Sequence, residues 1–341
     1  MATTAWWAGE TCPEPTYSTI PVGDPIRKDP CALKFDVILP GTNHIPGLYP
    51  WSHTLGADGF RRILRTLDEA GFHAVSVSEH LAMPLFEVPR LGAYWQDALS
   101  TMAFAAAATD RIRLDAAVLV LPYHHPLRLA KSLATIDVLS GGRVNVSIGV
   151  GHAEQEFAAM GVPFQERGAI ADEILEALNT LWTAEHPEHH GKYFEITGLA
   201  VDPQPVQQPR PPIYVGGNSA PALRRAARHD GWQPNPTNFT VEQIPPLLDY
   251  IREQPDYVGK EESFDINWLK SPAGITLSKG FDGATASELN GYRDQLIEVY
   301  RGRYRKIGIT RTVAEPPRSV GSEQEYLHYL GWFAEEVMPE V

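Results

Sequence analysis

From residue 33 onward, short apolar runs alternate with stretches of helical spacing, and this alternation limits the chain to folds built on a parallel sheet. Each strand–helix–strand step predicts a right-handed βαβ unit. Strands are expected at residues 35–40, 74–78, 114–121, 144–150, 213–215, near Trp232, 265–269 and 306–310. Helices are expected at residues 57–70, 95–108, 126–139, 169–182, 220–228, 287–301 and 323–337.

Regular βα units at this spacing predict a closed (β/α)8 TIM barrel, and an open doubly wound sheet is the alternative. About 250 residues suffice for such a barrel. The 341-residue chain therefore has room for one barrel domain, residues 33–341, with additions. One addition is a polar, proline-rich insertion at 186–208, after the fourth βα unit, with a short hairpin expected at 193–196. The other is an irregular N-terminal extension, residues 1–32.

Charge and cysteine content limit the partners and the compartment. The net charge of −13 and the pI of about 5.4 argue against nucleic acid or an anionic membrane surface, because both need a basic face. No apolar run approaches the roughly 20 residues of a membrane span, and no signal peptide is visible, so a cytoplasmic protein is expected.

Cys12 and Cys31 match no zinc or redox motif and are expected to be free thiols, although a disulfide remains open. Trp6 and Trp7 either belong to a surface tail or dock on a partner subunit or over the pocket.

In a barrel of this kind the chemistry lies where strands run into the following loops. His80 follows the second expected strand, and an imidazole there can exchange a proton near neutral pH. A buried histidine satisfied by hydrogen bonds is the alternative. Glu154, beyond the fourth strand, is either a second acid–base group or a residue that stabilises the start of the next helix.

Two glycine-rich turns follow strands on the same face. They comprise Gly149, Val150, Gly151 and His152, and Gly216, Gly217, Asn218 and Ser219. Glycines let a backbone approach a phosphate, whose oxygens can bind the free amides of a helix start, but tight βα turns have the same composition. His186, His189 and His190 are interpreted as an exposed loop rather than a metal site, so no metal is expected.

Aromatic and imidazole side chains lie between these motifs. His44, Trp51, Trp95 and Tyr123 are expected to wall a pocket for an apolar or aromatic organic substrate, unless they are plain core residues. Aromatic walls and a few titratable groups suit a flat conjugated ligand.

Four stretches of the sequence resemble the luciferase-like flavin oxidoreductases, especially the actinobacterial branch that uses the deazaflavin coenzyme F420. They are "DEAGFHAVSVSEHL", "ATDRIRLDAAVLVLPYHHPLRLAKSLATIDVLSGGRVNVSIGVG", "ERGAIADEILEALNTLW" and "PPIYVGGNSAPALRRAARHDGW". Together they cover about residues 33–232, and the extension and most of the last hundred residues do not share the likeness.

The resemblance implies specific roles. His80 would be the histidine near the reactive ring, with Glu79 at the ring edge. Ala117 and Val118 would form a non-prolyl cis peptide behind the ring. The two glycine-rich turns would hold the ribityl chain and phosphate, and Glu154 would serve protonation. A homodimer is also implied.

The resemblance leaves two cofactors open. With F420, the expected cofactor, hydride passes to or from a small organic substrate. With reduced FMN, the alternative, one oxygen atom is inserted and a separate reductase is needed. A non-catalytic flavin-binding protein and a barrel hydrolase that uses Glu79 and Glu154 are further alternatives.

Overall fold

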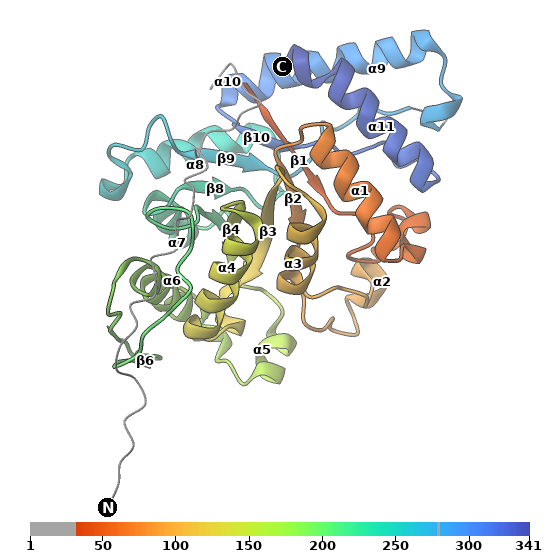
Figure 1. The fold of residues 1–341 in the computed structure, drawn as a ribbon. Helices are drawn as coiled ribbons and strands as arrows, with labels where there is room; N and C mark the ends of the chain where they lie inside the picture. The colour runs from red at the N-terminus through yellow and green to blue at the C-terminus, as the bar shows by residue number, and fades with distance from the viewer. Residues whose placement is uncertain (1–31, 278–279) are drawn as a thin grey trace, which may run out of the picture.

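The computed structural model describes residues 32–277 and 280–341, and these residues form a closed barrel of eight parallel strands (Figure 1). The strands, in barrel order, are β1 (Lys34–Ile38), β2 (Ala74–Val77), β3 (Arg113–Val120), β4 (Val144–Gly149), β7 (Ile213–Gly216), β8 (Gly231–Gln233), β9 (Asp265–Trp268) and β10 (Arg311–Val313). Strand β10 pairs in parallel with β1, which closes the barrel. The predicted (β/α)8 barrel is thus confirmed, and the doubly wound sheet is excluded.

Helices cover the outside of the barrel. The longer ones are α1 (Ala57–Glu69), α3 (Ala98–Ala108), α4 (Pro126–Ser140), α6 (Arg167–Thr183), α7 (Ala220–Ala227), α8 (Ile244–Arg252), α9 (Ala286–Val299) and α11 (Glu323–Glu336). The short ones are α2 (Val88–Leu91), α5 (Glu154–Met160) and α10 (Arg305–Ile307). Helix α4 shows why the helices could be predicted from the sequence. Pro126 begins it and Gly141, with a φ of 68°, ends it.

The last predicted strand, residues 306–310, is wrong. Residues 305–307 continue the helical segment that follows α9, and Gly308, with a φ of 93°, ends it. The strand begins only at Arg311. A charged residue at the start of a strand looks exposed in the sequence, but this side chain points into the barrel, where it is fully buried.

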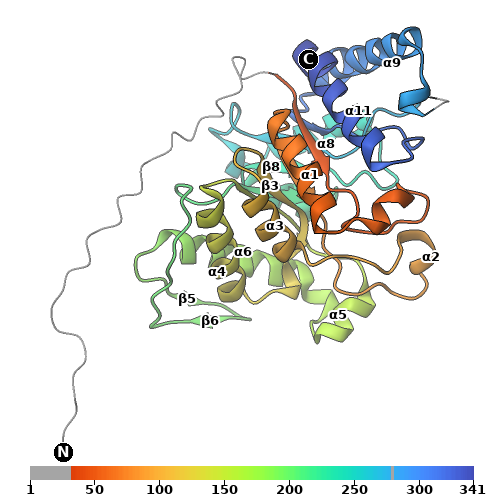
Figure 2. The ribbon, with the colours of Figure 1, turned by 45° about the vertical axis from the view of Figure 1, so that its right-hand side comes forward.

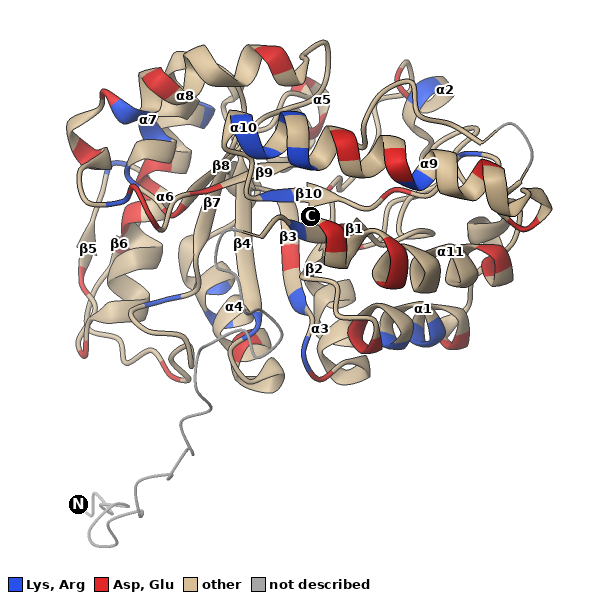
Figure 3. Cartoon of the chain, turned by 90° about the horizontal axis from the view of Figure 1, so that it is seen from above, with Lys and Arg blue, Asp and Glu red and all other residues tan. Residues whose placement is uncertain are grey.

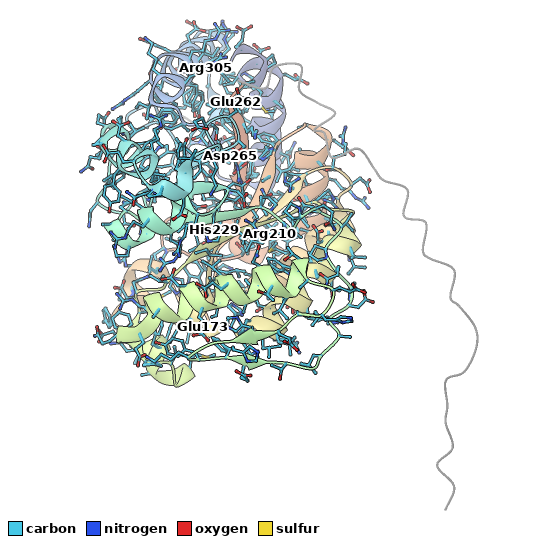
Figure 4. All side chains as sticks on the ribbon, turned by 90° about the vertical axis from the view of Figure 1, so that its left-hand side faces the viewer. Glu173, Arg210, His229, Glu262, Asp265 and Arg305 are labelled. Atoms are coloured by element: carbon cyan, nitrogen blue, oxygen red, sulfur yellow. The ribbon has the colours of Figure 1, made fainter. Side chains whose placement is uncertain are left out.

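Arg311 lies between two buried carboxylates inside the barrel. Its Nη2 contacts Asp36 Oδ2 at 2.6 Å and Asp115 Oδ2 at 2.5 Å, and all three side chains are fully buried. The Arg311 guanidinium also stacks over the Tyr214 ring at 4.7 Å. Asp265, labelled in Figure 4, accepts hydrogen bonds nearby from Thr310 Oγ1 at 2.8 Å and from the Tyr214 hydroxyl at 3.3 Å. These groups fill the end of the barrel at which the strands begin, so a ligand must enter from the other end.

The insertion after the fourth βα unit contains the predicted hairpin, displaced by a few residues. Its strands are β5 (His189–His190) and β6 (Glu195–Ile196), which pair antiparallel. Glu173 of α6, labelled in Figure 4, accepts the amide hydrogens of the hairpin turn: Lys192 at 2.9 Å, Tyr193 at 2.8 Å and Phe194 at 2.7 Å. A buried carboxylate therefore fixes the insertion to the barrel.

The histidines of the insertion have carboxylate neighbours of their own. His190 Nδ1 lies 2.7 Å from Glu195 Oε1, and His189 Nε2 lies 3.6 Å from Glu173 Oε1. Within residues 32–277 and 280–341, no three His, Cys, Asp or Glu side chains are grouped so that they could hold a metal ion. The cysteines, Trp6 and Trp7 lie outside the described residues.

Acidic and basic residues are interspersed over the outer helices α1 and α9, whereas the charged residues of α11 are all acidic (Figure 3). Some join neighbouring helices: Arg62 of α1 contacts Glu323 of α11 at 2.6 Å, and Arg293 of α9 contacts Glu336 at 3.1 Å. Among the helices that the structure describes, none combines the length and apolar character needed to cross a membrane.

Candidate active site at the carboxyl ends of the strands

The segments that follow β2 and β4 meet at one end of the barrel. Helix α2, in the segment after β2, and helix α5, directly after β4, lie at the same end in two views of the molecule (Figures 1 and 2). This is the end where the parallel strands terminate, and it gathers the side chains that their exits carry. His80 comes from the first segment, and His152 and Glu154 come from the second.

His80 is held by a carboxylate from α5. Its Nδ1 lies 3.0 Å from Glu156 Oε2, and the side chains of His80 and Glu156 are 14% and 2% exposed. Glu156 Oε1 accepts the amide hydrogens of Leu81 at 2.9 Å and Ala82 at 3.2 Å. One carboxylate therefore fixes both the imidazole and the loop that carries it.

Burial raises the pKa of Glu156, but hydrogen bonds from His80 and from the Ala82 amide outweigh burial and hold this pKa below the ordinary 4.5. An ionised carboxylate can only accept hydrogen bonds, so the proton of a neutral His80 resides on Nδ1. The Nε2 atom is then free to accept a proton. This arrangement is that of a general base oriented by an acid.

Glu156 was missed in the sequence, where Glu154 was chosen instead. Ala153, Glu156 and Phe157 are spaced three and four residues apart and share the buried face of α5, with Phe157 fully buried. Glu154 begins the same helix on its exposed side. The burial of Phe157 is the signal that could have selected Glu156. The protonating role of Glu154 stays a prediction.

Glu79 points toward β3 rather than toward Glu154. Its Oε2 accepts the Val120 amide hydrogen at 2.7 Å, and its two oxygens lie 3.0 and 3.1 Å from His124 Nε2. The adjoining Ala117–Val118 peptide bond is cis, as the resemblance implied. Ser78 Oγ donates to the Ala117 carbonyl at 3.0 Å. The loop after β2 thus braces the irregular part of β3 from two sides.

The glycine turns fit closely around Val118. A methyl group at position 149 would lie 2.9 Å from Val118 Cγ2, and one at position 216 would lie 3.1 Å from Val118 Cγ1. Gly217 has a φ of 112°, which favours glycine. The ends of β3, β4 and β7 can therefore approach each other only because two of them carry no side chain here.

Asn218 is already engaged within the protein. Its Nδ2 donates to the Asn235 carbonyl at 2.8 Å, and its Oδ1 accepts the Asn235 amide hydrogen at 2.9 Å. Ser219, which is exposed, precedes the first turn of α7, and its side chain makes no capping hydrogen bond there. The structure thus places Asn218 as a link between two loops and Ser219 at the open helix start.

Some of the residues predicted to wall the pocket lie near His80, and others lie far from it. Trp95 meets the edge of His80 with ring centroids 4.6 Å apart, and His152 lies 5.8 Å from His80. Burial lowers the pKa of His152, and His80 lowers it further. Tyr123 packs on the Phe157 ring at 4.9 Å, beneath α5.

Two other predicted wall residues contact different groups. His44 is sandwiched between His53 at 4.1 Å and Tyr94 at 3.8 Å. Trp51 packs 5.2 Å from Tyr326 of α11, and no ring contact joins Trp51 to His80 among the described residues.

A cavity of about 260 Å³ lies between the loop after β2 and the start of α5. Its polar lining is His80, Glu87, His152, Glu154 and Gln155, and its apolar lining is Met83, Pro84, Phe86 and Ala153. A cavity with an oriented imidazole, apolar walls and few polar groups suits a small organic ligand.

Replacing Glu156 by Gln is expected to lower the free energy of unfolding at pH 7 by about 1–3 kcal/mol, because hydrogen bonds to a charged carboxylate are lost. The folded-state pKa of Glu156 lies below the ordinary 4.5. The higher free energy of unfolding of the wild type is therefore present above pH 4.5 and is lost as the pH falls through the folded-state pKa. Urea unfolding at several pH values measures it. Glu154→Gln, in the same turn but exposed, is the control, and equal losses in both variants would contradict the assignment.

Comparison with known proteins gives a consistent family. Residues 34–267 match the family described as luciferase-like monooxygenase. An uncharacterised protein of Mycobacterium tuberculosis is 29% identical over 248 residues, which are 69% of this chain and 83% of that protein. The FMNH2-dependent dimethylsulfone monooxygenase of Pseudomonas putida is 34% identical over 164 residues, 47% of this chain and 45% of that enzyme. The coenzyme F420-dependent tetrahydromethanopterin reductase of Methanopyrus kandleri shares the fold with a TM-score of 0.64 and 16% identity, covering 90% of this chain and 99% of the reductase.

Proposed function

Because the chain belongs to the luciferase-like monooxygenase family and is an oxidoreductase, we propose that it uses coenzyme F420 to transfer hydride to or from a small organic substrate. The observation that carries this proposal is the His80–Glu156 pair, with Nδ1 and Oε2 3.0 Å apart. A hydride transfer at a carbon that bears oxygen also moves a proton, and His80 Nε2 is oriented to exchange it.

The residues at the strand ends fit a flat ring with a phosphate-bearing chain. Gly149 and Gly216 lack the side chains that would collide with Val118, so β3, β4 and β7 end close together where the ring would bind. Gly217 and Ser219 lead into α7, where free amides of a helix start suit a phosphate. These residues would hold the cofactor, and Trp95 and His80 would face the substrate.

The bound deazaflavin supplies a hydride acceptor or donor. A bound deazaflavin would take up the hydride from a substrate C–H bond, and His80 Nε2 is placed to take the hydroxyl proton as the C=O bond forms. Reduction is the reverse, with the proton returned to the new hydroxyl. Glu156 stabilises the imidazolium that forms, because its carboxylate is ionised and buried beside Nδ1.

A second candidate is oxygenation with reduced FMN. It is favoured by the 34% identity to the FMNH2-dependent dimethylsulfone monooxygenase, which extends over 45% of that enzyme. This route inserts one atom of O2 into the substrate and needs a separate reductase to supply the reduced flavin. The same glycine turns would hold FMN.

A binding titration distinguishes the two. We expect the cofactor-free protein to bind F420 with micromolar affinity, detected by quenching of tryptophan fluorescence, and to bind FMN and its reduced form much more weakly. Tight binding of reduced FMN alone would establish the monooxygenase instead. Binding of neither would contradict both candidates.

A further inference from the structure

The cavity beside His80 has room for a compact molecule. Its volume is about 260 Å³, well above the roughly 10–15 Å³ of such space that a single water needs. Met83, Pro84 and Phe86 form the wall opposite α5. A single ring or a short chain would therefore fill the cavity, and a larger ligand would extend beyond it onto the surrounding surface.

Large apolar side chains are exposed around this cavity. Leu85 is 89% exposed, Phe86 is 68% exposed and Leu81 is 46% exposed, and all three lie in the loop after β2. Apolar groups clustered in water beside a cavity mark a surface that a ligand or partner covers. Phe86 belongs both to this cluster and to the cavity lining, so the ligand that fills the cavity also covers part of the cluster.

The charged side chains that line the cavity are mainly acidic and therefore disfavour anions. Its lining contains Glu87 and Glu154 and no lysine or arginine. Glu87 is neutralised by Arg90, at 2.5 Å, whereas Glu154 is exposed and has no ion-pair partner among the described residues. The lowered pKa of His152 keeps that imidazole neutral at pH 7. A ligand carboxylate would find no lysine or arginine in this lining, and its desolvation would be poorly compensated.

We propose that the substrate is a small uncharged molecule with an apolar body and one hydroxyl or carbonyl group. Met83 and Phe86 contact the body, the oxygen reaches His80, and Glu154 repels anionic analogues. The place of this cavity in catalysis rests on the proposed function, whereas its selectivity for uncharged ligands can be measured without turnover.

The test uses two ligands of similar shape, cyclohexanol and cyclohexanecarboxylate, with binding measured by saturation-transfer NMR on the cofactor-free and the F420-loaded protein. We expect cyclohexanol to bind at least about tenfold more tightly than the carboxylate, because only the carboxylate loses hydration without a partner. Glu154→Lys is expected to raise the carboxylate affinity several-fold relative to the cyclohexanol affinity, because it replaces a repelling charge in the cavity lining by an attracting one. Equal or tighter binding of the carboxylate to the wild-type protein would overturn the proposal.

Variants of exposed apolar residues locate the bound ligand. Phe86→Ser is expected to weaken cyclohexanol binding about tenfold, because the cyclohexyl ring of the ligand loses its apolar contact with the Phe86 side chain. Leu139→Ser is the matched control, since Leu139 is 67% exposed on α4 and lies outside the cavity lining. Equal affinities in the two variants would place the ligand elsewhere and overturn the proposal.

These results are independent of the cofactor. Selective binding of cyclohexanol by a protein that binds neither F420 nor FMN would support the ligand class and contradict the proposed function. Preference for the carboxylate in a protein that binds F420 would contradict the ligand class and leave the proposed function supported.

Discussion

His80→Asn is expected to lower turnover by about 10²–10⁴-fold, which is the usual contribution of a general acid or base. The side-chain amide of asparagine lies close to the position of the imidazole Nδ1, so the variant keeps a hydrogen bond to Glu156 while it loses Nε2. The amides of Leu81 and Ala82 would still be bound by Glu156, and the loop would remain in place. Steady-state kinetics, together with a cofactor titration, measures the effect.

His328→Asn is the matched control for this variant. His328 is 66% exposed on α11, where it contacts Asp282 at 2.6 Å, and its loss should leave turnover unchanged. An unchanged rate in His80→Asn with intact cofactor binding would make the protein a flavin binder without His80-dependent catalysis. A lost rate with lost cofactor binding would instead assign His80 to cofactor binding and remove its role as a base.

Arg311→Met is expected to lower the free energy of unfolding by roughly 3–5 kcal/mol, because it removes the cation that pairs with the buried carboxyl groups of Asp36 and Asp115. The side chain is fully buried, so no water can replace the guanidinium without rearrangement. Denaturant unfolding at pH 7 measures the loss. Adding Asp36→Asn and Asp115→Asn to the same chain is expected to recover part of it, since the charges that need a partner are then gone.

Arg62→Met is the surface counterpart of this experiment. Arg62 contacts Glu323 at 2.6 Å but is 57% exposed, and exposed pairs contribute only about 0–1 kcal/mol. Similar losses in the Arg62 and Arg311 variants would show that the interior ion cluster adds nothing to stability beyond an ordinary surface pair.

The sequence predicted the barrel because its signals are local. A proline at 126 and a glycine at 141 bound a helix in any context, and strands such as β2 and β4 are short, mainly apolar runs that are buried along their whole length. His80 was found for the same reason, since it follows a strand directly.

The missed elements depend on contacts between distant residues. Strand β10 begins with an arginine whose charge is matched by Asp36 and Asp115, some two to three hundred residues earlier in the chain. The local sequence around Glu156 indicates an exposed residue on a helix. Its role depends on His80, which lies 76 positions away in the chain. Such pairs can be identified only in the folded structure, because the local sequence around one residue does not indicate where its partner lies.

The close packing of Val118 against Gly149 has a consequence for sequence variation. A methyl group at 149 would lie 2.9 Å from Val118 Cγ2 and has no other heavy atom within 4 Å except Val118 Cβ. Alanine at 149 is therefore tolerated only after the valine has lost its branches, whereas Val118→Ala alone leaves a small gap. The two positions form an epistatic pair, and a library that varies one position at a time would classify the glycine as immutable although a two-step route past it exists.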